Sequence, residues 1–190
     1  DPKKATVNSF KYHEDDKHGH KCPFGSHIRR TFPRDQLHSG RLREQSEEMT
    51  RKHRILRRGR IFGKPFVESM KPEDMLQAEK DDGVCRGIHF ICLVANIRRQ
   101  FEFIQNVWAN NFTFADLCNE VDPLIAPRPL KLEPLCNEFT VQDPELRRNY
   151  REIPQFTRVI GGSYFFLPGI AALKFLAKYT PATTSNYAEP

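Results

Sequence analysis

GIHFICLVA, residues 87–95, is a nearly continuous apolar stretch that is followed by Asn96. A run of this length and composition is typical of a β-strand buried on both faces. Asn96 is a favoured residue for capping the start of a helix. Apolar side chains then recur at helical spacing at Ile97, Phe101, Ile104 and Trp108. The sequence therefore predicts a strand followed by an amphipathic helix that ends near residue 110.

Further elements are expected on both sides of this unit. Residues 53–58 carry small apolar islands and precede Gly63, which predicts a short strand. Residues 158–167 contain two glycines followed by YFFL, which predicts a strand with a bulge. Pro168 is expected to open a last helix. The six prolines of residues 112–155 favour an irregular excursion over the surface.

The order of these elements predicts an α+β fold, with a ferredoxin-like antiparallel sheet and helices on one face. Residues 1–21 are rich in charged residues and histidine, and should form a polar arm that packs on another part or stays mobile. Residues 22–180 are expected to form the main domain, and residues 181–190 a tail. The sequence shows no signal peptide and no long apolar run, so we expect a soluble protein with no membrane partner, in a compartment that its residues do not identify.

Positive charge is concentrated in one part of the chain. The net charge is +6, and RKHRILRRGR, residues 51–60, holds six Lys or Arg residues and no acidic residue. Aromatic residues do not alternate with these cations as a base-stacking surface requires, so a solvated face is favoured over a nucleic-acid interface.

The five cysteines form no C-x-x-C pair, and Cys92 is expected to act as a small buried apolar side chain.

His27 follows a Pro-Phe-Gly turn and precedes Ile28, Arg29 and Arg30, a segment that is expected to form a short helical turn before Pro33. This setting is compatible with an imidazole that faces a bound metal while the two arginines neutralise nearby anionic groups. A structural histidine is the alternative, because the chain has seven histidines. A zinc site is a further alternative, since a compact set of donors has the spacing H-x-H-x-C-x4-H: His18, His20, Cys22 and His27.

Five blocks, in this order, resemble the C-terminal region of dye-decolourising peroxidases. The first two are CPFGSHIRRTFPRD, residues 22–35, and HRILRRGRIFG, residues 53–63. The others are RGIHFICL, residues 86–93, QFEFIQNVW, residues 100–108, and GGSYFFLP, residues 161–168. The resemblance implies a haem-dependent peroxidase that reduces hydrogen peroxide and oxidises an organic electron donor.

The resemblance also implies a role for individual residues. His27 matches the proximal ligand of haem b, Arg57 the distal arginine, and Arg34 an arginine near a haem propionate. Ile88 and Phe90 match the apolar residues that wall the peroxide pocket, and their spacing places them on one face of a strand. An arginine in that pocket would stabilise the negative charge that develops on the leaving oxygen.

Two features depart from the family pattern. Phe32 stands where the family has asparagine, and the chain has no Gly-x-x-Asp-Gly block, whose aspartate is the distal acid–base group in this family. The family fold consists of two ferredoxin-like halves with haem between them, and that block belongs to the first half. The chain therefore resembles a second half, and its expected partner is a missing N-terminal half or a second copy of itself.

Three questions stay open at the level of sequence. A non-catalytic or degenerate haem-binding module is the alternative to a peroxidase. Trp108 and Tyr164 are candidate electron relays, but we expect both in the core. No pattern identifies the carboxylate that would hydrogen-bond to Nδ1 of His27.

Overall fold

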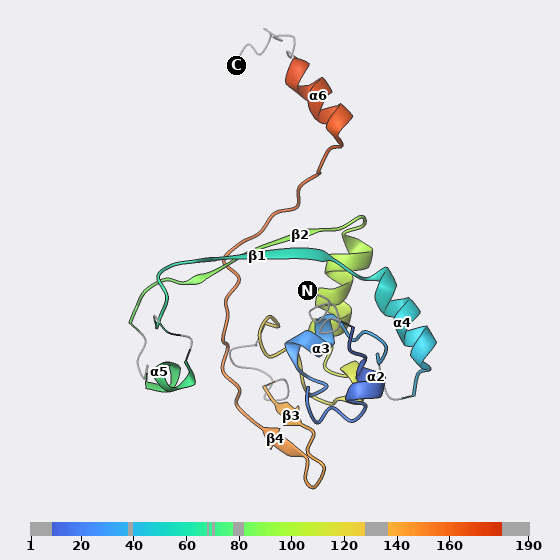
Figure 1. Cartoon of the computed structure of the whole chain (residues 1–190), viewed down its shortest axis with the longest axis vertical. Coiled ribbons are helices and arrows are strands. Elements are labelled where there is room, and N and C mark those ends of the chain that lie inside the picture. The colour runs from blue at the N-terminus through green and yellow to red at the C-terminus, as the bar shows by residue number, and fades with distance from the viewer. Residues whose placement is uncertain are drawn as a thin grey trace, which may run out of the picture. The chain divides into compact units, whose positions relative to one another are not determined.

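The structure is a computed structural model, and it describes residues 9–37, 40–67, 69, 71–77, 82–127 and 137–179 (Figure 1). Its helices are α2 (Tyr12–Asp15), α3 (His27–Thr31), α4 (Arg43–Lys52), α5 (Pro72–Gln77), η1 (Arg98–Glu102), η2 (Ile104–Ala109), η3 (Phe114–Asp116) and α6 (Ile170–Lys178). Its strands are β1 (Leu56–Phe62), β2 (Gly87–Leu93), β3 (Phe139–Val141) and β4 (Arg148–Tyr150). The chain divides into two compact units, Asp1–Arg158 and Val159–Pro190.

In the first unit, β1 and β2 pair antiparallel from Leu56↔Leu93 to Phe62↔Gly87, and we call this pair the β1–β2 ribbon. The apolar stretch that begins at Gly87 is therefore a strand, as expected. Its partner begins at Leu56 instead of His53, so the prediction for residues 53–58 was wrong at its start. The reason is that the His53 ring stacks on Phe103 with centroids 3.6 Å apart, which holds this residue in the helical part of the unit.

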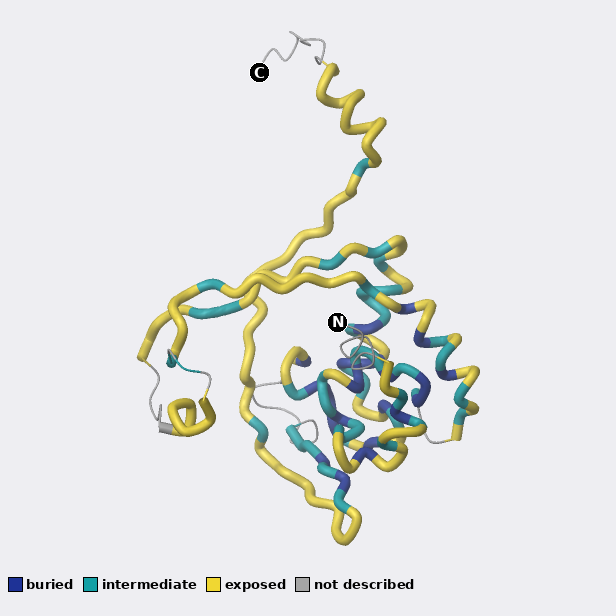
Figure 2. Tube along the Cα trace, in the orientation of Figure 1, coloured by how far each residue is buried: buried dark blue, intermediate teal, exposed yellow. Residues whose placement is uncertain are grey.

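The predicted helix after β2 is confirmed as η1 and η2, which have wider π-helical turns. Asn96 caps it as expected, because its side-chain oxygen accepts a hydrogen bond from the Arg99 amide at 2.8 Å. Trp108 lies in the core, as predicted. The core cluster consists of Ile104, Trp108 and Phe114, with Leu37, Ile55, Phe103 and Ala115 packed against it. Buried residues gather in the helical part, whereas the β1–β2 ribbon is mostly exposed (Figure 2).

The region expected to be irregular, residues 112–155, is more ordered than predicted. It contains η3 and a short antiparallel pair, β3 with β4, in which Phe139 is opposite Tyr150. Each proline removes only one backbone N–H donor from the hydrogen bonds between strands. Short strands can therefore form between the prolines. Residues 128–136, which include Cys136, lie outside the described part of the chain. The described residues thus form two two-stranded antiparallel sheets, within an α+β architecture.

The second unit contains α6, which begins two residues after Pro168 and confirms the predicted last helix. Residues 158–167 form no strand, so that prediction was wrong. A strand requires a hydrogen-bonded neighbour, and paired glycines weaken one further. Tyr164 is exposed here instead of lying in a core, and residues 181–190 lie outside the described part. Among the described helices, none is long and apolar enough to cross a membrane.

Residues 9–21 pack against other parts of the first unit, which is one of the two outcomes expected for a polar arm. Tyr12 is buried with its ring 4.3 Å from the guanidinium of Arg29. Burial raises the pKa of the Tyr12 phenol above its usual range. Lys11 forms an ion pair with Glu47 on α4. An aromatic anchor and surface charge pairs therefore attach this segment.

The core cluster supports a first prediction. Trp108 is 3% exposed, so Trp108→Ala should leave a cavity and lower the free energy of unfolding by about 3–5 kcal/mol, measured by urea denaturation. Phe112→Ala is the matched control, because this aromatic residue is 54% exposed and its loss should cost less than about 1 kcal/mol. Equal losses in the two variants would contradict the assignment of the core.

Candidate functional site

His27 is the first residue of α3, and the local sequence explains why a helix begins there. The side chain of Ser26 caps the helix by accepting a hydrogen bond from the Arg29 amide. The preceding turn is closed by a bond from the Ser26 amide to the Pro23 carbonyl oxygen at 3.0 Å. The short helical turn expected from the sequence is therefore confirmed, and it fixes the backbone of His27.

The imidazole of His27 pairs with a carboxylate 95 residues away in the sequence. Nδ1 of His27 donates to Oδ2 of Asp122 at 2.8 Å, since an ionised carboxylate can only accept. The Asp122 side chain is fully buried, whereas the His27 side chain is 34% exposed. Oδ1 of Asp122 accepts from the amides of Leu124 and Ile125 at 2.9 and 3.0 Å. The carboxylate is thus held in place on both oxygens.

This pairing suits a metal-ligating histidine. A bond from one ring nitrogen to a buried carboxylate fixes the tautomer and orientation of the ring, and makes the other nitrogen a better ligand. Nε2 of His27 is therefore the candidate ligand atom, and the residues present fit a haem iron at this position. Sequence reasoning missed Asp122, because nothing in the spacing of residues 112–155 connects this aspartate with α3.

Arg29 and Arg30 do not serve as surface cations, so the expectation that they neutralise anionic groups of a bound cofactor was wrong. Their side chains are 1% and 0% exposed and are turned into the protein. Arg30 donates to four carbonyl oxygens, those of Gly25, Trp108, Asn111 and Glu120. Burial lowers the pKa of Arg30 to about 10, and the charges of Asp122 and Glu120 oppose this shift. Its guanidinium therefore stays charged near neutral pH.

The β1–β2 ribbon brings three of the predicted site residues together. Arg57 is opposite Cys92, and Phe90 and Ile88 follow at two-residue steps along β2. Because residues opposite each other and residues two apart share a face, Arg57, Phe90 and Ile88 lie on the same face of the ribbon. The expected placement of Ile88 and Phe90 on one face is confirmed. The roles of these residues remain predictions.

Arg34 lies apart from the ribbon, in the loop after α3. Its backbone has a φ of 56°, in the left-handed region. Its guanidinium lies 3.9 Å from the ring centre of Phe10 and 4.9 Å from that of Phe32. Phe32, which departs from the family pattern, therefore supports the side chain of Arg34 through its ring.

The zinc alternative is not supported by the geometry. The rings of His18 and His20 stack with centroids 5.7 Å apart, while His27 is bonded to Asp122. Within the part of the chain that the structure describes, no three His, Cys, Asp or Glu residues are grouped to hold a metal ion.

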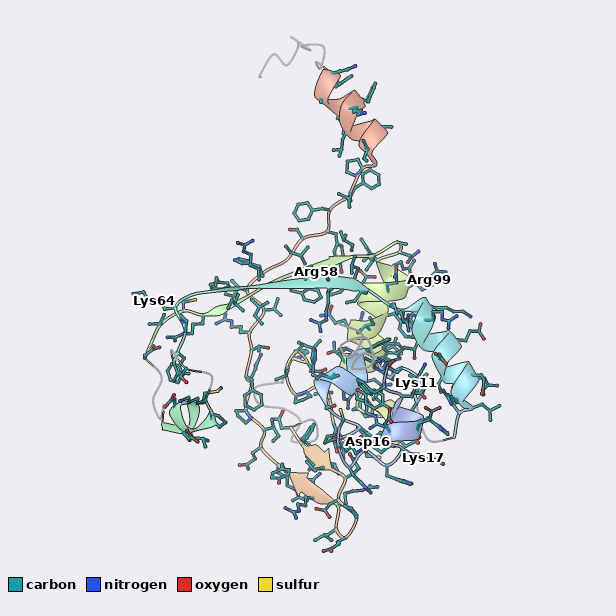
Figure 3. The ribbon with its side chains drawn as sticks, viewed as in Figure 1. Lys11, Asp16, Lys17, Arg58, Lys64 and Arg99 are labelled. Atoms are coloured by element: carbon teal, nitrogen blue, oxygen red, sulfur yellow. The ribbon has the colours of Figure 1, made fainter. Side chains whose placement is uncertain are left out.

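The cations of the basic run are exposed, as a solvated face requires. Arg57 and Arg58 are exposed, and Lys52 pairs with Glu48 at 2.7 Å. Figure 3 labels Arg58 on β1 and Lys64 just beyond this strand.

Cys92 is partly buried, and burial raises the pKa of its thiol.

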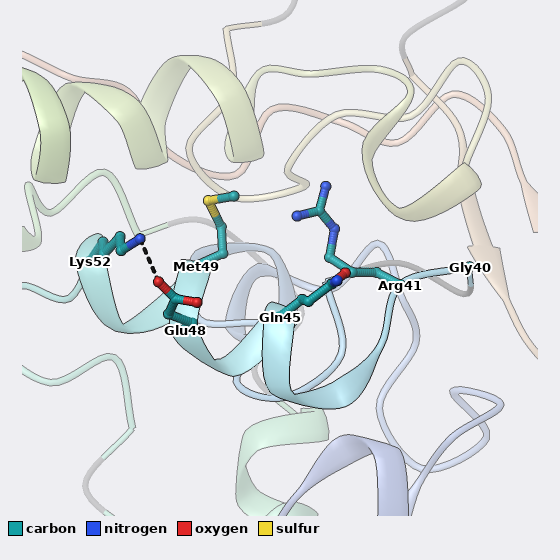
Figure 4. Close-up of a pocket in the computed structure, with 6 residues that line it drawn as sticks. All are labelled: Gly40, Arg41, Gln45, Glu48, Met49 and Lys52. Atoms are coloured by element: carbon teal, nitrogen blue, oxygen red, sulfur yellow. Dashed lines mark hydrogen bonds and ion pairs between the residues drawn. The ribbon is translucent and has the colours of Figure 1, made fainter.

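A surface hollow of about 490 Å³ lies along α4 (Figure 4). It is lined by Gly40, Arg41, Gln45, Glu48, Met49 and Lys52. None of the predicted site residues belongs to it, and one of its cations is already paired with Glu48. The hollow is therefore separate from the candidate site.

Comparison with known proteins shows what the chain resembles. No protein-family model matches it. It is 36% identical, over 89% of its length, to the multifunctional dye peroxidase DyP2 of Amycolatopsis sp., and 31% identical, over 93%, to a dye-decolorizing peroxidase of Mycena epipterygia. The chain belongs to the dye-decolourising peroxidase family. It spans 35% and 32% of the lengths of these two relatives.

Solved structures of dye-decolourising peroxidases share its fold. The structure of DyP2 from Amycolatopsis sp. matches with a TM-score of 0.56 and 29% identity, over 78% of this chain and 30% of that one. A DyP-type peroxidase from Anabaena sp. matches with a TM-score of 0.54 and 28% identity, over 76% and 27%. The chain thus corresponds to about a third of a dye-decolourising peroxidase.

The buried carboxylate supports a second prediction. Asp122→Ala should leave the Leu124 and Ile125 amides without their acceptor, and should lower the free energy of unfolding by about 1–3 kcal/mol in chemical denaturation. Asp143→Ala is the matched control, because Asp143 also accepts from a backbone amide and pairs with Arg148, but is partly exposed. That variant should lose less than about 1 kcal/mol. A smaller loss for Asp122→Ala than for the control would refute the assigned role.

Proposed function

We propose that this chain is the haem-binding part of a dye-decolourising peroxidase, which reduces hydrogen peroxide and oxidises organic donors. The hydrogen bond between His27 and Asp122 is the observation that carries the proposal. It leaves Nε2 of His27 as the metal-ligating atom and makes the imidazole more electron-donating. Bound haem b would supply the redox chemistry of peroxide reduction.

Arg57 would act on the peroxide. Its guanidinium carries several hydrogen-bond donors, and it stands on the same ribbon face as Ile88 and Phe90. In that position it would orient hydrogen peroxide and stabilise the negative charge on the departing oxygen. The two apolar side chains would exclude water from this charge, which strengthens the interaction. Arg34 would pair with a haem propionate while its guanidinium rests on Phe10 and Phe32.

The chain would function together with further protein. Ile88 and Phe90 are 65% and 50% exposed, although both are large apolar residues on the face that carries Arg57. An apolar face of this kind is normally covered by another surface. We propose that the chain is one ferredoxin-like half of a duplicated fold, and that an N-terminal half or a second copy completes the pocket. The partial coverage of the relatives supports this proposal.

A haem-binding module without turnover is the second candidate. It is favoured by one observation, the absence of a Gly-x-x-Asp-Gly block from the 190 residues. Oxidation of an organic donor by the haem-loaded chain in the presence of peroxide separates the two. Donor oxidation would exclude the module. A lack of oxidation would favour the module only when the further protein that completes the pocket is also present.

The ligand assignment leads to a third prediction. His27→Ala should remove the axial bond, so the Soret band of the haem-loaded chain should lose its histidine-ligated form in an absorption spectrum. His89→Ala is the control, because His89 lies on β2 outside the proposed pocket face. An unchanged spectrum for His27→Ala would show that the iron is held elsewhere.

A fourth prediction concerns the peroxide side. Arg57→Leu should preserve haem binding and slow the reaction with hydrogen peroxide by about 10²–10³-fold in stopped-flow measurements, because the developing charge loses its cation. Arg58→Leu is the matched control, since the next residue on β1 points to the opposite face. Equal slowing in both variants would point to the overall positive charge of the ribbon instead of a specific arginine.

A further inference from the structure

Arg30 is fully buried, and its bonds connect three segments that are distant in the sequence. Nε donates to the Gly25 carbonyl oxygen at 3.2 Å, next to the start of α3. Nη1 donates to the carbonyl oxygens of Trp108 and Asn111, both at 2.9 Å, at the end of η2. Nη2 donates to the Glu120 carbonyl oxygen at 2.7 Å. One side chain thus links α3, η2 and the segment that leads to Asp122.

The position of Asp122 depends on the same link. Glu120 is only two residues before Asp122, so the bond from Arg30 fixes the backbone that carries the carboxylate. The Asp122 amide donates to the Ala109 carbonyl oxygen at 2.8 Å, which attaches this backbone to the end of η2. Arg30 also lies close enough to Asp122 for their opposite charges to attract. Geometry and charge therefore both hold the carboxylate in place.

We propose that Arg30 is a positioning residue that holds Asp122 against Nδ1 of His27, and so decides which imidazole nitrogen is free to bind iron. The part of this inference that concerns iron rests on the proposed function. The part that concerns the His27–Asp122 pair does not, because it rests only on the hydrogen bond between these two side chains.

Arg29 provides an internal comparison. It is as buried as Arg30 and belongs to the same short helix. Its guanidinium bonds to the Asp16 carboxylate at 3.0 Å, to the Cys22 carbonyl oxygen at 2.8 Å and to the Gln36 side chain at 2.7 Å. These partners lie in and beside the N-terminal arm. A general loss of packing around α3 should therefore follow from changes at either arginine, whereas an effect on Asp122 should follow from Arg30 alone.

The test uses the full chain without haem, labelled with ¹⁵N in histidine, and compares Arg30→Lys with Arg29→Lys. Lysine keeps the charge, but one ammonium group cannot reach four separate carbonyl oxygens. At pH 9, well above the ordinary titration range of imidazole, long-range ¹H–¹⁵N spectra report the tautomer of each neutral ring. The unaltered chain should hold His27 mainly as the Nδ1–H tautomer.

Arg30→Lys should shift His27 towards the Nε2–H tautomer, whereas Arg29→Lys should lower the melting temperature and leave the tautomer unchanged. A folded Arg30→Lys variant with an unaltered tautomer would overturn the proposal. An equal shift in Arg29→Lys would also overturn it, because the effect would then be general.

A measurement on the unaltered chain keeps the proposal testable if Arg30→Lys does not fold. The Nη hydrogens of Arg30 should exchange with water at least about 100-fold more slowly than those of the exposed Arg57, because burial and three hydrogen bonds to carbonyl oxygens protect them from solvent. Equal exchange rates would show that the link does not persist in solution.

The haem-loaded chain tests the iron-related part separately. Arg30→Lys should raise the reduction potential of the bound haem, since a less firmly held Asp122 makes His27 a weaker electron donor. An unchanged potential would overturn this part. If the chain binds no haem, the proposed function fails, and the tautomer experiment still decides the role of Arg30.

Discussion

The buried guanidinium of Arg30 is the constraint on which the rest of the candidate site depends. Taking a charge out of water is costly unless its donors find acceptors, and here four carbonyl oxygens accept hydrogen bonds from the guanidinium. Those oxygens belong to residues that lie up to 90 positions from Arg30 in the sequence. Satisfying one charge therefore requires α3, η2 and the segment before Asp122 to meet. The hydrogen bonds of the Arg30 side chain thereby bring together the segments of a core that contains few large apolar side chains.

This arrangement explains how a short helix can present a metal ligand. Five residues of α3 have little stability in isolation, so the orientation of His27 has to come from tertiary contacts. Ser26 caps the helix, Arg30 anchors it, and Asp122 fixes the imidazole from the opposite segment. The β1–β2 ribbon contributes differently, because its residues are positioned by strand register and not by burial. Its exposed apolar face is consistent with a chain that spans about a third of its relatives.

The departures from expectation have specific physical causes. Residues 158–167 have the composition of a strand, but composition cannot provide a neighbouring strand, and the described residues include none for them. His53 belongs to a basic stretch that looked like the start of a strand, yet its ring stacks on Phe103 and stays with the helices. Arg29 and Arg30 were expected to neutralise anionic groups near a bound metal, whereas both are buried, and only acceptors from other segments made this burial possible.

The sequence by itself determined the elements that depend on local pattern. These are the strand that begins at Gly87, the helix capped by Asn96, the short turn that starts at His27 and the last helix after Pro168. It also carried the family resemblance, because motifs in a fixed order can be recognised without knowing which residues contact one another. Only the tertiary structure decided that Asp122 is the partner of His27 and that Arg30 is buried beside it. The reason is that these bonds join residues up to 95 positions apart, and periodicity or capping chemistry contains no information on which distant segments meet.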